Sequence, residues 1–309
     1  MSLDFLQLFS DYTLRNVALG SAVLGVTGGV VGSFTMLRRQ SLLGDALSHA
    51  ALPGVALAFL LTSSKASLWL LLGAGLTAWL AAMLMLAAVR YTRLSEDAAL
   101  GTVLASFFGV GLVLLTYIQK VGGAGQAGLD KFLFGQAATI VHSDIFLMVI
   151  LAAVALGTIA LLFKEFKLIS FDPDFAATIG LPTKALATLL TSLAVVAVMV
   201  GLQTVGVVLM ASMLIAPPAA ARQWTDNLSQ MLLLSAVFGA LSGIGGALLS
   251  ASGPNLPTGP FVIVIATLIL LISLGFAPRR GILWNALRRR RQAHAFRAEI
   301  LAQESQEVG

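Results

Sequence analysis

The chain has 309 residues, of which 58% are hydrophobic and 11% are charged, and its formal net charge is +5. A mean hydropathy of +0.93 excludes an ordinary water-soluble domain and indicates an integral membrane protein. Because cysteine is absent from the sequence, disulfides, thiolate metal sites and cysteine nucleophiles are excluded.

The chain contains eight apolar stretches long enough to cross a membrane, since a hydrocarbon core of about 30 Å needs roughly 20 helical residues. These nearly charge-free stretches are residues 16–37, 41–62, 66–89, 98–118, 145–163, 185–221, 229–251 and 261–278. We expect the first to remain as a membrane anchor, because it lacks the features of a signal peptide. The sequence predicts an all-α polytopic protein, with a transmembrane domain over 1–280 and a basic tail over 281–309.

The sixth stretch is too long for one crossing. Its 37 uncharged residues would extend about 55 Å as a single helix at roughly 1.5 Å per residue. Gly201 and Gly206 lie near its middle, and Pro217 and Pro218 lie near its end. Helical hydrogen bonding fails at such positions. We therefore expect this stretch to break or fold back, which adds a possible ninth span or a half-helix.

Basic residues in the short loops predict the orientation of the chain, because such loops face the cytoplasm. The residues that mark this side are Arg38, Arg39, Arg90, Arg93, Lys164, Lys167, Lys184, Arg222, Arg279 and Arg280. Alternation places the N-terminus outside if 16–37 is a full span. The tail, with six arginines over 279–291, favours a cytoplasmic anchor beside anionic lipid over nucleic-acid binding.

Asp45 and His49 interrupt an otherwise apolar stretch, LLGDALSHAALPG at 42–54. We expect Asp45 to be the only acidic residue well inside a span, where a carboxylate costs at least about 2.5–3.5 kcal/mol unless it faces a cavity or a partner. At four residues apart, both side chains share one helical face. An imidazole nitrogen with a carboxylate oxygen provides half of a site for Mn²⁺ or Zn²⁺.

Other roles for this pair remain open. Asp45 and His49 could relay protons in a secondary transporter, although the spans do not divide into clearly equivalent halves. They could also hydrogen-bond each other and fix helix packing. If they bind a metal, two ligands are too few, and a second subunit would contribute another pair. An intramembrane enzyme would need a third ligand and a general base, which the sequence does not offer.

A short cytoplasmic helix is predicted in FDPDFAATIGLP at 171–182. Asp172 suits an N-cap, Pro173 the first helical position, and Asp174 the positive end of the helix dipole. Gly180 suits the C-terminal stop. Such a short helix cannot bury itself, so a partner surface and an ordinary capped loop helix are both compatible with the pattern.

The sequence lacks the motifs GxxxxGK[ST], HExxH and GxSxG. It therefore offers no P-loop for ATP and no support for a zinc protease or a serine hydrolase. We do not expect this chain to be an enzyme.

Four stretches resemble a known family. They are LRRQSLLGDALSHAALPGVALAFLL, SEDAALGTVLASFFGVGLVLL, AGLDKFLFGQAATIVHSDI and LQTVGVVLMASMLIAPPAAAR. Over about residues 15–278, the chain is similar to the permease subunits of bacterial ATP-binding-cassette importers for manganese, zinc and related divalent metals. The resemblance implies a type II importer permease fold in the bacterial plasma (inner) membrane. It also implies a cytoplasmic ATPase that hydrolyses ATP, a second permease chain, identical or paralogous, and an extracytoplasmic metal-binding protein.

The resemblance also implies roles for particular residues. Asp45 and His49 would bind the transported Mn²⁺, Zn²⁺ or Fe²⁺ transiently, with no permanent cofactor. The segment at 171–182 corresponds to the coupling helix that docks on the ATPase. Its implied coupling residues are Asp172, Pro173, Asp174, Phe175, Ala176 and Gly180. The stretch AGLDKFLFGQ is more similar to the manganese-type members than to the zinc permeases, and the tail is more basic than the family leads us to expect.

Overall fold

The computed structural model describes residues 12–63, 66–121, 142–202, 204–252 and 256–284, and in these residues it contains helices and no strand. Eight of the described helices are long and apolar enough to cross a membrane. They are α2 (Tyr12–Leu37), α3 (Leu43–Thr62), α4 (Ser67–Tyr91), α5 (Glu96–Val121), α7 (His142–Leu161), α10 (Thr183–Leu202), α12 (Leu228–Ala251) and α13 (Thr258–Phe276). The predicted all-α polytopic fold is therefore confirmed. The AGLDKFLFGQ stretch and most of the basic tail lie outside the described residues.

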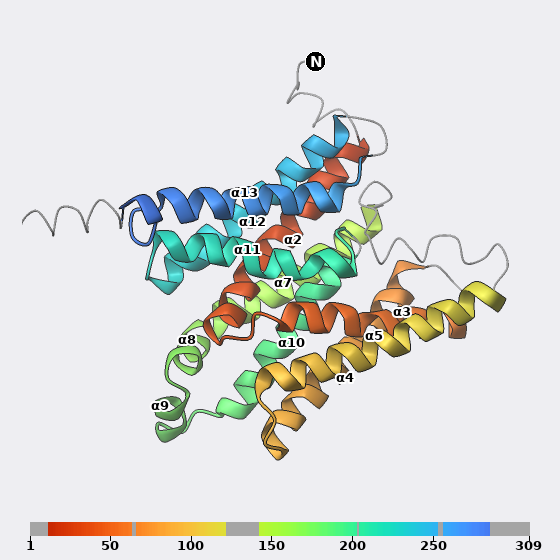
Figure 1. Cartoon of the computed structure of the whole chain (residues 1–309), viewed down its shortest axis with the longest axis horizontal. Coiled ribbons are helices and arrows are strands. Elements are labelled where there is room, and N and C mark those ends of the chain that lie inside the picture. The colour runs from red at the N-terminus through yellow and green to blue at the C-terminus, as the bar shows by residue number, and fades with distance from the viewer. Residues whose placement is uncertain (1–11, 64–65, 122–141, 203, 253–255, 285–309) are drawn as a thin grey trace, which may run out of the picture.

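The long apolar stretch at 185–221 is broken in two, as predicted. Helix α10 ends at Leu202, and α11 (Val207–Trp224) begins after Gly206. Gly206 has a φ of +84°, a conformation that glycine adopts without steric cost. The carbonyl of Gly201 accepts hydrogen bonds from the backbone N–H groups of Thr204 and Val205, at 3.2 and 3.0 Å. Helix α11 runs back from this turn (Figure 1), as the predicted break requires, but it is not one of the eight described helices long and apolar enough to cross a membrane.

Helix α2 forms the centre of the bundle, where it packs against α7, α10, α11 and α12. Small residues allow the close approach of α12: a Cβ added at Gly25 would lie 2.1 Å from the carbonyl oxygen of Gly239. The hydroxyl of Ser33 also donates to that of Ser235 across the same interface, at 2.9 Å. Close packing of small residues and interhelical hydrogen bonds hold helices together where the hydrophobic effect cannot.

One end of the bundle gathers the basic loops, and we call it the basic end. Two contacts between distant segments show that its loops meet. The amide of Gln40 donates to the carboxylate of Glu96 at 3.2 Å, and the rings of Phe34 and Phe166 have centroids 6.0 Å apart. The short helices α8 (Phe163–Phe171) and α9 (Pro173–Thr178) also lie at this end, on the left of Figure 1. The basic end comprises residues 38–42, 92–95, 162–182, 225–227 and 277–281.

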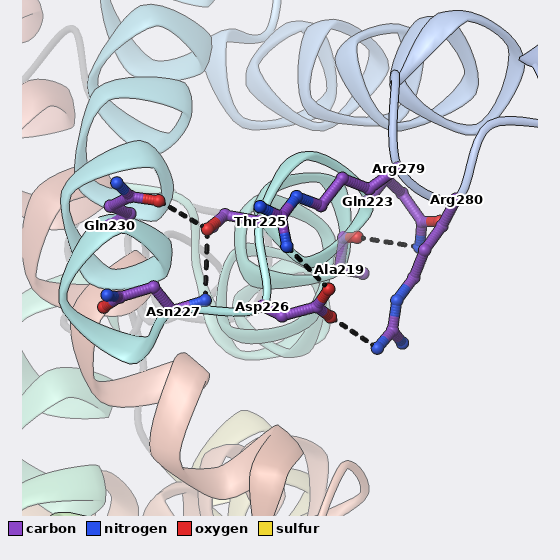
Figure 2. Close-up of polar contacts among 8 residues, drawn as sticks. All are labelled: Ala219, Gln223, Thr225, Asp226, Asn227, Gln230, Arg279 and Arg280. Atoms are coloured by element: carbon purple, nitrogen blue, oxygen red, sulfur yellow. Dashed lines mark hydrogen bonds and ion pairs between the residues drawn. The ribbon is translucent and has the colours of Figure 1, made fainter.

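A cluster of ion pairs fastens the segment after α13 to the α11–α12 loop (Figure 2). The Asp226 carboxylate accepts from Arg279 Nη1 at 3.2 Å and from Arg280 Nη2 at 2.6 Å. These two hydrogen bonds lower the pKa of Asp226 below its ordinary value. The backbone N–H of Arg280 also donates to the carbonyl of Gln223, at 3.3 Å. We call Asp226, Arg279 and Arg280 the C-terminal clip.

Candidate metal centre and partner surface

Asp45 and His49 come together on one face of α3, as their spacing predicts. His49 Nε2 lies 3.4 Å from Asp45 Oδ1. The side chains are 16% and 33% exposed, respectively, so a small ion could reach both. This face of α3 is neither sealed inside the chain nor fully open.

Asp45 lies near the start of its helix, so the prediction that it lies well inside a span is wrong. Helix α3 begins at Leu43, and Asp45 lies in its first turn. The chain first turns at residues 38–42, where the Gln40 N–H donates to the carbonyl of Thr35 at 2.9 Å and Arg39 has a φ of +61°. A carboxylate in the first turn interacts favourably with the helix dipole. The cost of placing Asp45 here is therefore lower than that of a carboxylate at mid-span.

The separation of the two side-chain atoms is compatible with a shared ion. An N–H···O hydrogen bond spans about 2.7–3.2 Å, which is shorter than the 3.4 Å between His49 Nε2 and Asp45 Oδ1. Two ligands that each lie ~2.1 Å from a tetrahedral ion are about 3.4 Å apart. A tetrahedral ion bound to both atoms would therefore need little change in their separation.

The His49 ring is held by a residue that the sequence analysis missed. The ring packs edge-on against Phe108 of α5, with a centroid distance of 4.7 Å. Its Nδ1 is buried and has no hydrogen-bond partner among the described residues. Phe108 gave no signal in the sequence, because one phenylalanine in an apolar helix resembles any other.

As a candidate metal site, the pair is incomplete within the described part of the chain. Among the residues that the structure describes, no group of three or more His, Cys, Asp or Glu side chains comes together. A tetrahedral ion needs four ligands, and a harder ion needs more. Water or a second protein chain must supply the others.

The predicted short helix is present as α9, with the predicted residues at its two ends. Asp172 is the N-cap, and its Oδ1 accepts from the backbone N–H of Phe175 at 2.9 Å. Pro173 is the first helical residue. Gly180 has a φ of +87°, and hydrogen bonds from Gly180 N–H to Ala177 O and from Leu181 N–H to Ala176 O close the helix.

Large apolar side chains stay exposed around α9. Phe171, Phe175 and Ile179 are 54%, 52% and 55% exposed, and we call them the α9 apolar surface. Ala176, the next residue along α9, is fully buried. The sequence analysis named Phe175 and missed the other two, which lie at the end of α8 and at the C-cap of α9.

Comparisons with known proteins agree with this fold. A model of the ABC 3 transport family matches residues 10–277. The zinc transport system membrane protein TroC of Treponema pallidum is 50% identical over 287 residues, which cover 93% of this chain and 96% of TroC. The manganese transport system membrane protein MntC of Bacillus subtilis is 49% identical over 272 residues, which cover 88% of this chain and 62% of MntC.

A solved structure gives the same result. The structure of PsaBC from Streptococcus pneumoniae in complex with Fab superimposes with a TM-score of 0.79 and 32% identity, over 91% of this chain and 98% of the PsaBC chain. It supports the permease fold expected from the sequence. With eight described helices that can cross a membrane, this chain is a multi-pass plasma-membrane protein that belongs to the ABC 3 transport family.

Proposed function

We propose that this chain is the membrane-spanning subunit of an ATP-driven importer that moves Mn²⁺ or Zn²⁺ into the cytoplasm. The observation that carries the proposal is the pair of Asp45 and His49, whose ligand atoms lie 3.4 Å apart on an accessible face of α3. Two relatives are named for zinc transport and for manganese transport, which supports the same class of metal.

Each ligand has a separate chemical role in this proposal. The Asp45 carboxylate offsets part of the charge of the dication, which no apolar span could hold alone. The His49 imidazole offers a neutral nitrogen, which favours Mn²⁺ and Zn²⁺ over Mg²⁺ and Ca²⁺ because the latter prefer all-oxygen sites. The metal is cargo and binds transiently. A second permease subunit, facing the same conduit, supplies the remaining ligands together with water.

The basic end faces the cytoplasm and binds the ATPase subunit, on which ATP is hydrolysed. Phe175 and the rest of the α9 apolar surface form the contact, because exposed aromatic side chains gain most from burial against a partner. Asp172, Pro173 and Gly180 fix the shape of α9, and Ala176 seats it on the bundle. Asp174, in the first turn of α9, interacts favourably with the positive end of the helix dipole. On the opposite side, an extracytoplasmic metal-binding protein delivers the ion.

The metal role is tested by Asp45→Asn and His49→Ala in the full transporter, reconstituted with its ATPase. We expect each variant to reduce uptake of Mn²⁺ and Zn²⁺ by a factor of ~10 or more, since each removes one of few ligands. The matched control is Asp97→Asn, because Asp97 is an exposed carboxylate in the first turn of α5. Co-purification of the ATPase reports assembly.

Two results would contradict the proposal. Normal uptake by both variants would remove Asp45 and His49 from the transport path. Uptake that survives ATP depletion but stops when a protonophore is added would instead support the proton-coupled secondary transporter.

A further inference from the structure

We infer that Leu214 of α11 is a positioning residue for Asp45, through its contact with Gly44 at the start of α3. The inference rests on the proposed metal role of Asp45. Gly44 directly precedes Asp45 in the chain. A Cβ added at Gly44 would lie 2.6 Å from Leu214 Cδ1 and 3.3 Å from Leu214 Cβ. The Leu214 side chain therefore fills the space that any larger residue at position 44 would need.

Leu214 has little freedom to give way. It is 2% exposed. Its backbone carbonyl packs against α2, because a Cβ added at Gly32 would lie 2.0 Å from Leu214 O. Leu214 thus contacts two helices at positions where neither has a side chain. Leu214 is therefore one of the residues through which α11 packs closely on both α2 and the first turn of α3.

The two ligands of the pair are held by different neighbours. The first turn of α3 rests on α11 through Gly44, whose carbonyl also accepts from Ser48 Oγ at 2.6 Å. His49 instead rests on Phe108 of α5. A change at the Leu214–Gly44 contact would therefore act on the turn that carries Asp45, whereas a change at Phe108 would act on the His49 ring. Ligand geometry of this kind must be held to within about 0.5 Å to remain productive.

Helix α11 is itself fastened at the basic end. The indole Nε1 of Trp224, its last residue, donates to Ser273 Oγ of α13 at 2.9 Å. The C-terminal clip follows directly, at Asp226. Leu214 is therefore part of a helix whose position is fixed by contacts other than its contact with Gly44.

The test compares Gly44→Ala, Leu214→Ala and the double variant in the assembled transporter, from initial uptake rates over a range of Mn²⁺ concentrations. We expect Gly44→Ala to raise the half-saturating concentration about tenfold, with a smaller change in the maximal rate, as for residues that orient metal ligands. Leu214→Ala leaves a cavity and should raise the half-saturating concentration less than Gly44→Ala does. The double variant should recover toward the native value, because the shortened side chain makes room for the new methyl group.

The matched control is Gly101→Ala on α5. Gly101 is an exposed helical glycine, and a Cβ added there would meet no atom of the described residues within 4 Å. It gains the same helix propensity as Gly44→Ala without the steric contact. We expect native uptake from this variant.

Several outcomes would overturn the inference. One is a native half-saturating concentration in Gly44→Ala, and another is a double variant that loses the sum of the two single losses. If Gly44→Ala fails to co-purify with the ATPase, Leu214→Val replaces it. That variant should raise the half-saturating concentration ~2-fold or more, and an unchanged value would overturn the inference.

Failure of the inference can be told apart from failure of the metal role. If Asp45→Asn keeps normal uptake, the metal role is wrong whatever Gly44→Ala does. If Asp45→Asn loses uptake and Gly44→Ala keeps native half-saturation, the metal role stands and only the positioning role of Leu214 fails.

Discussion

The first two turns of α3 and the short helix α9 each carry side chains that are wrong for their surroundings, but in opposite senses. Helix α3 places a carboxylate and an imidazole, Asp45 and His49, in a helix that crosses the membrane. Around α9, Phe175 and its neighbours expose apolar surface at the polar, basic end. Each region lacks its proper neighbour within one chain. In the proposed function, that neighbour is an ion for α3 and another protein for α9.

The exposed fraction of an apolar side chain does not by itself distinguish a partner surface from a lipid-facing surface. Helix α13 exposes Val264, Leu268 and Leu271, each by more than half. These side chains suit their surroundings, because lipid covers them in a membrane. Phe175 is exposed to a similar extent, at 52%, but at an end where water is the solvent. The position in the bundle, and not the exposed area, is what supports the proposal that α9 binds a partner.

Phe175→Ala tests whether the α9 apolar surface binds the ATPase subunit. Full burial of a phenylalanine side chain contributes about 1.5–3 kcal/mol, so losing it should weaken binding of the ATPase subunit roughly 10- to 100-fold. Titration of the purified permease with the ATPase, followed by transport-linked ATP hydrolysis, measures this change.

Phe146→Ala is the matched control for Phe175→Ala. Phe146 is 68% exposed near the start of α7, which is a span and not part of the basic end. We expect native ATPase binding from this variant. Equal effects of the two substitutions would mean that α9 has no special role as a partner surface.

A smaller effect is expected from the residue that shapes α9. Asp172→Ala removes the N-cap hydrogen bond to Phe175 N–H, at a cost of about 1 kcal/mol to the helix. Because Gly180 and Ala176 still hold the other end, we expect only a ~5-fold loss in ATPase affinity. Asp172→Asn keeps a capping oxygen and should bind as the native chain does. If asparagine is as harmful as alanine, the charge of Asp172 contacts the partner directly.

The sequence predicts these two regions well because their signals are local. Asp172, Pro173 and Gly180 each have one preferred position in a helix, so α9 could be placed without knowledge of the fold. The four-residue spacing of Asp45 and His49 is equally local. The break after Leu202 followed from length, because 37 uncharged residues exceed one crossing.

The parts that the sequence could not predict depend on contacts between distant segments. Nothing in the uncharged residues 40–43 marks Leu43 as the start of α3, so the depth of Asp45 was wrong. Leu214 and Gly44 are 170 positions apart, and nothing in an apolar pattern says which leucine meets which glycine. The partial access to His49 likewise depends on Phe108, which belongs to another helix. Choice of packing partner is a property of the whole bundle.

The C-terminal clip differs from both α3 and α9, because its charged groups form ion pairs within the chain. Hydrogen bonds from Arg279 and then Arg280 lower the pKa of Asp226. The clip therefore contributes stability at every pH above the ordinary carboxyl range, and loses it only as the pH falls through the lowered pKa.

Asp226→Asn should therefore have the smallest effect of these substitutions on transport, because the Trp224–Ser273 and Arg280–Gln223 hydrogen bonds remain. Exposed ion pairs also contribute little. We expect native uptake but faster cleavage by trypsin after Arg279 and Arg280 at neutral pH, with Asp97→Asn as the control. An unchanged cleavage rate would mean that the clip does not hold this segment. A large loss of uptake would mean that the ion pairs of Asp226 matter as much for transport as Asp45 and His49. The contrast between charged groups that have partners within the chain and those that need an outside partner would then be wrong.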